Sequence, residues 1–280
     1  MKIGDYEILL IETGYISLDG GAMFGVVPKT LWQKTNPADE FNRITLALRL
    51  LVLKSPERLI IVDTGVGNKL NEKLSKIYNV DHSTHNLQSE LNKKDIDPNE
   101  VTDVIVTHLH FDHIGGATYF DSGDLKLTFP NAIHHIQGEQ WHWGTNPSEK
   151  DRTSYMPENF MPILEQAKLN ELPGPGTLYA GIDLLVMYGH THGMQLPKIY
   201  DADHTLLYCA DLIPTASHIP LPYIMGYDNN PMTTLEEKRR ILPQAVEENW
   251  TLVFEHDPYR QAGTIELTEK GYRLKEEINL

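Results

Sequence analysis

Four side chains of metal-binding type lie within six residues of one another along the chain. They are His108, His110, Asp112 and His113, and they form the pattern HxHxDH. Neutral imidazoles together with a carboxylate suit zinc, iron or manganese. The chain has 13 histidines but one cysteine, so histidines and carboxylates must supply the ligands. We therefore predict a metal site here rather than a solvated polar loop.

Three further candidates follow apolar segments elsewhere in the chain. His190 comes after the sequence LLVMY, Asp211 after LLYCA and His256 after TLVFE. A short loop cannot surround an ion by itself, and polar groups at the ends of strands collect where α/β proteins build their sites. We expect these three residues to complete the ligand set.

The periodicity of apolar residues predicts the elements that position these ligands. The expected strands are 6–12, 43–53, 59–63, 101–107, 125–129, 132–137, 183–188, 196–200, 205–210, 251–255, 263–267 and 271–275, and the expected helices are 68–77, 86–94, 158–170 and 234–247. Two successive runs of strands with helices attached indicate an α/β fold of two sheets packed face to face with helices outside. Residues 145–160 and 171–177 are rich in Pro, Asn, Ser and Gly, so we interpret them as surface excursions of a single domain, 1–280.

Composition limits the partners of the chain. Lys and Arg number 24 against 39 Asp and Glu, which gives a formal net charge of -15. Such a surface repels nucleic acids and anionic membranes. No apolar run approaches the roughly 20 residues of a membrane span, and the first residues lack the apolar core of a signal peptide. We expect a cytoplasmic protein with a small-molecule substrate, no nucleic-acid partner and no membrane partner; the oligomeric state stays open, with a homodimer as one alternative.

Taken together, the motifs resemble those of the metallo-β-lactamase superfamily. The HxHxDH motif, the GHTxG histidine, an isolated aspartate and a final histidine occur in that order, and the turn Asp63-Thr64-Gly65 precedes them. The resemblance covers residues 7–260 and implies a four-layer αββα sandwich of two mixed sheets with helices outside. It also implies the ligand assignment: His108, His110 and His190 for one metal, Asp112, His113 and His256 for the other, and Asp211 between them.

The resemblance further implies a mechanism with two divalent metal ions, zinc first, with iron or manganese as alternatives. A hydroxide shared by the two metals would attack the substrate, and Asp112 and Asp211 would be the catalytic carboxylates. Either Asp211 or a metal-bound water would protonate the leaving group. Asp63 is expected to orient a ligand histidine or, alternatively, to be a plain turn residue.

Within the superfamily, the chain is most similar to the acyl-homoserine lactonase and methyl parathion hydrolase branch. The sequence Gly226-Tyr227-Asp228 and a following basic helix support this placement, whereas Pro214 stands where these lactonases often have a tyrosine. The expected substrate is therefore an ester, a lactone or a related carbonyl compound, with a phosphotriester as a variant. The alternatives are a thioesterase similar to glyoxalase II, whose basic patch the sequence lacks, and a non-catalytic metal-containing sensor or binding protein.

Several other residues could have a functional role but can also be explained as loop, core or surface residues. His192 is a proton donor or substrate contact, or else a plain loop residue; His218 and Tyr223 line the pocket or simply pack. Met23 and Phe24 contact an apolar substrate or belong to a core, and Cys209 is expected to be buried and inert. Six histidines are expected to be structural or superficial: His82, His85, His134, His135, His142 and His204.

Overall fold

The computed structural model describes all residues, 1–280, and its centre is formed by two seven-stranded mixed sheets. The first sheet uses the strands of the N-terminal part of the chain, and β4, β5, β8 and β9 run parallel to one another. In spatial order its strands are β1 (Lys2–Ile3), β2 (Tyr6–Asp19), β3 (Arg43–Lys54), β4 (Leu59–Val62), β5 (Asp103–Ile105), β8 (Ile133–Gln137) and β9 (Leu169–Leu172).

The second sheet uses the C-terminal part of the chain and keeps the order of the sequence. Its strands are β10 (Gly176–Tyr179), β11 (Ile182–Met187), β12 (Met194–Tyr200), β13 (Thr205–Tyr208), β14 (Thr251–Val253), β15 (Ala262–Thr268) and β16 (Gly271–Ile278). Only β13 and β14 pair in parallel, because α8 connects them as a crossover. A separate hairpin joins β6 (Thr118–Asp121) to β7 (Asp124–Leu127).

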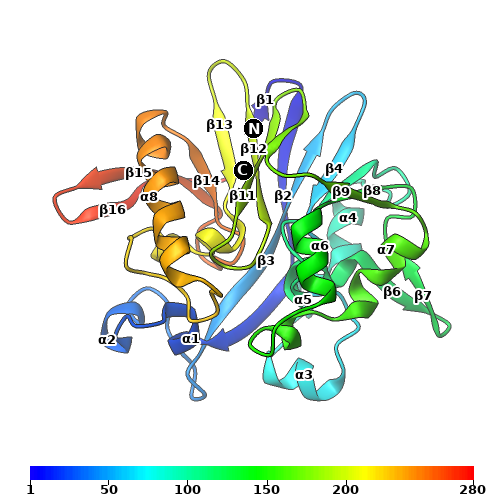
Figure 1. Ribbon diagram of the computed structural model, residues 1–280, viewed down its shortest axis with the longest axis horizontal. Coiled ribbons are helices and arrows are strands. Elements are labelled where there is room, and N and C mark those ends of the chain that lie inside the picture. Colours follow the sequence, from blue (N-terminus) through cyan, green and yellow to red (C-terminus); the bar gives the residue numbers. More distant parts are fainter.

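Helices cover the outer faces of both sheets, with α8 on one side and α4, α6 and α7 on the other (Figure 1). The α-helices are α1 (Gly20–Phe24), α2 (Lys29–Trp32), α3 (Glu72–Ile77), α4 (Leu87–Lys93), α5 (Phe111–Ile114), α6 (Gly138–Thr145), α7 (Met161–Glu165) and α8 (Pro231–Glu247). Five 3-10 turns complete the list: Gly115–Ala117, Arg152–Ser154, Pro157–Asn159, Ala210–Leu212 and Ala216–His218. None of the helices has the length and apolar character needed to cross a bilayer. The expected αββα sandwich is confirmed.

The period of two along the strands explains why the chain forms layers. On β3, Leu51 and Leu53 belong to the core shared with the second sheet, whereas Leu50 and Val52 belong to the core that includes Leu91 of α4. Successive side chains of a strand point to opposite faces, so a strand covered on both sides has to be apolar throughout. Each of these residues is fully buried, which contributes about 1.5 to 3 kcal/mol per side chain.

The carboxyl ends of the central parallel strands meet at one edge of the sandwich, and the loops there carry the predicted site. Asp63 follows β4, and the HxHxDH segment follows β5. From the second sheet, Asp211 follows β13 and His256 follows β14. In Figure 1 this edge is the lower one, where α5 lies just below α6. Binding sites of α/β sheets collect at this end of the strands.

Some expected elements are wrong in extent or type. The strand expected at 6–12 continues to Asp19. The helix expected at 158–170 is the short helix α7 followed by strand β9, because Ala167 adopts a left-handed backbone conformation with φ 54° and ends the helical path. The segment 145–160 is more than a surface excursion, since Asp151, Tyr155 and Phe160 are buried.

Two further expectations fail near the second sheet. Residues 171–177 contain the end of β9 and the start of β10 rather than a plain loop. The strand expected at 205–210 ends at Tyr208, and Asp211 lies in the following 3-10 turn. Cys209 and Asp211 therefore do not share a strand face. Cys209 is buried, as expected.

Candidate metal centre

The structure brings all seven predicted ligands together in two buried groups. The ligand atoms of each group lie within 4.8 Å of one another. The first group is His108, His110, His190 and Asp211, and the second is Asp112, His113 and His256. None of the seven residues has more than 8% of its surface exposed. Residues spread over about half of the chain thus converge on one spot, which the spacing of the motif alone could not guarantee.

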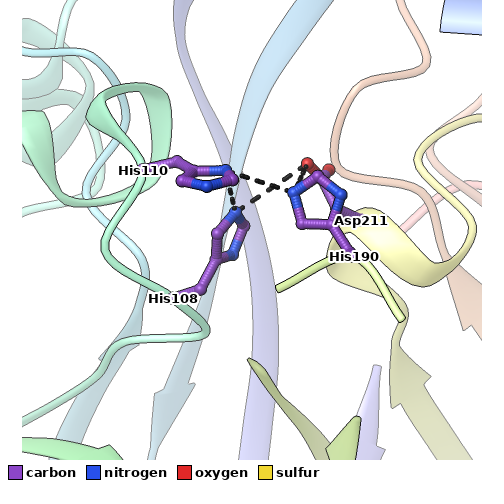
Figure 2. A group of neighbouring side chains, drawn as sticks. All are labelled: His108, His110, His190 and Asp211. Carbon is purple, nitrogen blue, oxygen red and sulfur yellow. Dashed lines mark hydrogen bonds and ion pairs between the residues drawn. The ribbon is translucent and has the colours of Figure 1, made fainter. Parts of the chain in front are cut away.

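In the first group, three imidazoles point their ring nitrogens at one another (Figure 2). His110 Nδ1 lies 3.0 Å from His108 Nε2 and 3.1 Å from His190 Nε2. Asp211 Oδ2 lies 3.0 Å from His190 Nε2 and 3.8 Å from His108 Nε2. His108 and His110 come from the loop after β5, whereas His190 comes from the loop after β11, so the two sheets share the group.

The second group lies on the other side of Asp211. His113 Nε2 and His256 Nε2 are 3.2 Å apart. Asp112 Oδ2 lies 3.9 Å from the former and 3.8 Å from the latter. Asp211 Oδ1 lies 3.2 Å from His256 Nε2, and its Oδ2 lies 3.6 Å from His113 Nε2. One carboxylate therefore faces both groups.

The outer ring nitrogens of four of these histidines meet acceptors. His108 Nδ1 lies 3.0 Å from Thr107 Oγ1, which itself donates to Asp63. The other three acceptors are Asp63 Oδ2 for His113 Nδ1 at 3.1 Å, Asp228 Oδ1 for His190 Nδ1 at 2.9 Å and the Ala47 carbonyl for His256 Nδ1 at 2.8 Å. Each acceptor holds the proton of a neutral ring on the outer nitrogen, so the inner nitrogen presents its lone pair to the group.

This arrangement fits divalent cations. Lone pairs that face one another at 3.0 to 3.2 Å repel unless a proton or a cation lies between them. Two nitrogens at about 2.0–2.1 Å from a tetrahedral zinc ion are themselves about 3.3 Å apart. Asp211 Oδ1 is buried and accepts no well-aligned hydrogen bond, although it lies 3.2 Å from His256 Nε2. Imidazoles and carboxylates form a donor set that accepts zinc, iron and manganese.

Electrostatics divide the histidines into two kinds. Burial and the neighbouring histidines hold the pKa of His108 and of His110 well below its usual value. Burial has the same tendency at His190 and His256, but the Asp211 carboxylate outweighs it and raises the pKa of each to about 9. Protons therefore occupy part of the site when no cation does, and cation binding must release them.

Two residues of the centre have a backbone conformation that side chains rarely adopt. Asp63 has φ 59°, and Ala210, which directly precedes Asp211, has φ 40°. A left-handed conformation of a residue other than glycine costs about 1 to 3 kcal/mol and is frequent at functional sites. The sequence is compatible with two roles for Asp63, namely orienting a ligand histidine and forming a plain turn. Its contact with His113 supports the orienting role.

The residues with open roles lie around the centre rather than in it. His192 stacks on Trp143 with ring centroids 4.1 Å apart. His218 is buried between Thr215 Oγ1 and the Met23 carbonyl, both at 2.8 Å from its ring nitrogens. Phe24 stacks on His218 at 4.5 Å and contacts Tyr223 edge-on at 6.1 Å. Met23 and Phe24 thus belong to a core, and His218 ties that core to the loop after Asp211.

The six histidines that we set aside stay outside both groups. His82, for example, joins the Thr13 and Gly67 carbonyls, and His135 lies 2.7 Å from Asp103 Oδ1. His134 is buried within the first sheet, and His142 and His204 are exposed. His85 is half-buried beside Glu90 at 2.9 Å.

Sequence reasoning missed four residues that support the centre. Asp228 accepts a hydrogen bond from His190. The fully buried Glu255 places its Oε2 3.2 Å from His113 Nδ1. Burial raises the pKa of Glu255 to about 7. Gln140 and Tyr155 contact the loops of the first group. Glu255 could have been noticed because it precedes His256, but nothing in the sequence singles out Gln140 or Tyr155.

Comparison with known proteins places the chain among metal-dependent enzymes. Residues 50–256 match the family described as the metallo-β-lactamase superfamily. A probable metal-dependent hydrolase from Staphylococcus aureus has a solved structure with a TM-score of 0.87 and 31% identity, and the match covers 100% of both chains. A probable metallo-hydrolase of Mycobacterium tuberculosis is 24% identical over 243 residues, which are 77% of this chain and 76% of that protein.

A further solved structure is that of AidC, a dizinc quorum-quenching lactonase, in complex with the product N-hexanoyl-L-homoserine. It matches with a TM-score of 0.82 and 24% identity over 100% of this chain and 97% of that chain. At this identity, the likeness establishes the shared fold.

Proposed function

The chain belongs to the metallo-β-lactamase superfamily of metal-dependent hydrolases, and on this premise we propose that it holds two divalent ions and cleaves an ester, a lactone or a related carbonyl bond of a small molecule. The observation that carries the proposal is the position of Asp211. Its Oδ2 lies 3.0 Å from His190 of the first group, and its Oδ1 lies 3.2 Å from His256 of the second. A carboxylate between two ligand groups is the ligand that two ions would share.

Each ligand group has a defined task in this proposal. The ions would be zinc first, with iron or manganese as alternatives, held by His108, His110 and His190 on one side and by Asp112, His113 and His256 on the other, with Asp211 shared. Such ions would lower the pKa of a water molecule and polarise the oxygen of the substrate's carbonyl group.

The chain's own residues supply the remaining steps. Asp112 and Asp211 are the carboxylates that face the reacting atoms, and Asp211 is our proposed proton donor to the leaving group. Its Oδ1 is buried and lies 3.2 Å from His256 Nε2, so the carboxylate is within proton-transfer distance of a ring nitrogen of the site. No serine or cysteine nucleophile is required, and Cys209 is buried with a strongly raised pKa.

One observation favours a carbonyl substrate: the likeness in fold to AidC, a dizinc lactonase with a bound acyl-homoserine product. Phe111 and Tyr155 lie next to the ligands but are buried in hydrophobic cores, so they support the ligand loops rather than offer a surface to a substrate. A net charge of -15 disfavours a strongly anionic thioester such as a glutathione derivative.

The test begins with metal content by elemental analysis of gently purified protein. We expect about two ions per chain in the wild type and fewer in His110→Ala. His142→Ala is the matched control, because His142 is an exposed histidine outside both groups. The same proteins are then assayed with aryl esters, acyl lactones, phosphotriesters and thioesters.

Hydrolysis of esters or lactones that requires His110 but not His142 would support the proposal. Preference for thioesters would mean that the substrate is a thioester rather than an ester or a lactone. Two bound ions without turnover of any of these compounds would favour a metal-containing binding protein instead. One ion or none, unchanged in His110→Ala, would refute the dinuclear centre.

A further inference from the structure

The two loops that carry the first ligand group come from different sheets, and one buried side chain joins them. That side chain belongs to Gln140 of α6, which is 0% exposed. The backbone N–H of Leu109, between His108 and His110, donates to Gln140 Oε1 at 3.2 Å. Gln140 Nε2 donates to the carbonyl of His192 at 2.6 Å, two residues after His190.

A primary amide is the chemistry that this position requires. One loop presents an N–H and the other presents a carbonyl, so the joining group must accept on one side and donate on the other. A glutamate would turn a second acceptor toward the His192 carbonyl, and a methionine of similar length could bond to neither loop. A buried donor or acceptor left without a partner costs about 1 to 3 kcal/mol.

Close packing of α6 against both loops makes this contact specific. A Cβ added at Gly193 would lie 2.8 Å from the backbone nitrogen of Gln140, and one added at Gly144 would lie 2.6 Å from Leu109 Cδ1. Tyr155 adds a second tie, since its hydroxyl lies 2.7 Å from Thr191 Oγ1 while its ring contacts His110. Helix α6 is therefore in direct van der Waals contact with both ligand loops.

We propose that Gln140 is a positioning residue that sets the separation between His108 and His110 on one loop and His190 on the other, and so tunes the affinity of the first ligand group for its ion. The inference rests on the proposed function, because it assumes that this group holds a divalent ion. Gln140 makes no contact with the second group, whose supports are Asp63, Glu255 and the Ala47 carbonyl. Its effect is therefore confined to one of the two ions.

Gln137 provides a matched control. It is the N-cap residue of α6 and is similarly buried, at 2% exposure. Its amide donates to Gln195 Oε1 at 2.8 Å and touches neither ligand loop. Gln137→Met and Gln140→Met thus remove the same group from two buried positions, the N-cap and the first turn of α6, and comparison of the two separates loss of stability from loss of positioning.

The experiment is cadmium-113 NMR of the metal-depleted protein reloaded with Cd²⁺, together with calorimetric titration of Zn²⁺. The cadmium resonance that disappears in His110→Ala identifies the first group. We expect Gln140→Met to shift or broaden that resonance and to weaken the matching Zn²⁺ affinity by about 10- to 100-fold. The other resonance and the spectrum of Gln137→Met should resemble those of the wild type.

Equal effects of the two methionine variants, or an unmoved first resonance in Gln140→Met, would overturn the inference. If Gln140→Met does not fold, Gln140→Glu keeps the acceptor for Leu109, and Gln137→Glu is then its control. Failure of the proposed function has a different signature, because wild-type protein would then bind fewer than two cadmium ions or would bind two and hydrolyse nothing. The positioning role of Gln140, in contrast, is tested by the cadmium resonance of the first ligand group alone.

Discussion

Two clusters of histidine and carboxylate side chains lie buried at opposite ends of β5. The candidate metal centre follows the strand, whereas Asp103 begins it. Asp103 is 2% exposed and collects four donors around its carboxylate. They are His135 Nε2 and the Tyr179 hydroxyl at 2.7 Å, the Thr102 hydroxyl at 2.6 Å and the Arg58 guanidinium at 3.1 Å. Tyr179 belongs to β10, so this cluster joins the two sheets.

The clusters use the same residue types but differ in how their polar atoms meet. Around Asp103, donors face an acceptor, and the side-chain amide of Asn170 lies 2.9 Å from the remaining nitrogen of His135. In the metal centre, nitrogens face nitrogens at 3.0 to 3.2 Å. A cluster in which donors meet acceptors stabilises the fold, while one whose ring nitrogens converge on one another is suited to bind a cation in exchange for protons. Composition alone does not separate these cases.

The largest effect should come from Asp211, the one carboxylate that faces both ligand groups. Asp211→Asn replaces an anionic oxygen by a neutral amide and can no longer serve both groups. We expect a loss in kcat/KM on the order of 10³-fold, or about 4 kcal/mol, and a lower metal content. Steady-state kinetics on the best ester or lactone, with metal analysis of the same sample, measure both. Unchanged kinetics in folded Asp211→Asn would contradict the central role of this residue.

The counterpart at the other end of β5 is Asp103→Asn, which should affect stability and not chemistry. Replacing the carboxylate weakens charge-assisted hydrogen bonds and turns an amide N–H₂ toward donors, so the free energy of unfolding should fall by about 2 to 3 kcal/mol. Urea denaturation gives that value, and metal analysis should still find the wild-type content. A variant that keeps its stability but loses metal would break the distinction between the two clusters.

The pH dependence of this stabilisation follows from the sign of the pKa shift. Burial acts to raise the pKa of Asp103, but the hydrogen bonds from His135, Thr102 and Tyr179 outweigh it and hold the pKa well below its usual value. A depressed folded-state pKa means that the contribution is present above about pH 4 and is lost as the pH falls through the folded-state pKa. The difference between wild type and Asp103→Asn should therefore be constant from about pH 5 to 7 and shrink in stronger acid.

An intermediate effect is expected for Asp228, which supports His190 without being a ligand. Its Oδ1 fixes the outer proton of His190, and its Oδ2 accepts from Thr234 at 2.9 Å. Asp228→Ala should lower the affinity of the first group for Zn²⁺ by about 10- to 100-fold. Calorimetric titration measures it, and Asp203→Ala, at an exposed aspartate, is the control. If Asp228→Ala lost only stability, this aspartate would belong with Asp103 rather than with the metal centre.

The two clusters also show which information the sequence carried. The HxHxDH motif could be recognised because its candidate ligands are neighbours in the chain, and His190, Asp211 and His256 because each follows an apolar strand. The alternating strands likewise predicted two sheets with helices outside. These features depend on local spacing, which sequence patterns report directly.

What the sequence did not reveal depends on partners that are distant in the chain. Gln140 matters because Leu109 and His192 meet on either side of it, and Asp228 matters because the segment before α8 contacts His190. Helix α6 itself has a sequence, GEQWHWGT, without a clear amphipathic period. The left-handed turn at Ala210 was missed for a related reason, since only the position of Asp211 in the finished fold explains why a strained residue is tolerated there.

The smallest effect should come from relieving that strain. Ala210 and Asp63 have positive φ at the metal end, whereas no residue of the Asp103 cluster does. Ala210→Gly removes the cost of the left-handed conformation but gives the unfolded chain more freedom, so the free energy of unfolding should rise by no more than about 1 kcal/mol. Ala245→Gly, at a buried position within α8, is the matched control and should lose about 1 kcal/mol. Equal losses of unfolding free energy in both variants would mean that Ala210 carries no strain. A gain in Ala210→Gly with unchanged kcat/KM would show that glycine also holds Asp211 in place. The strain would then not be required for turnover.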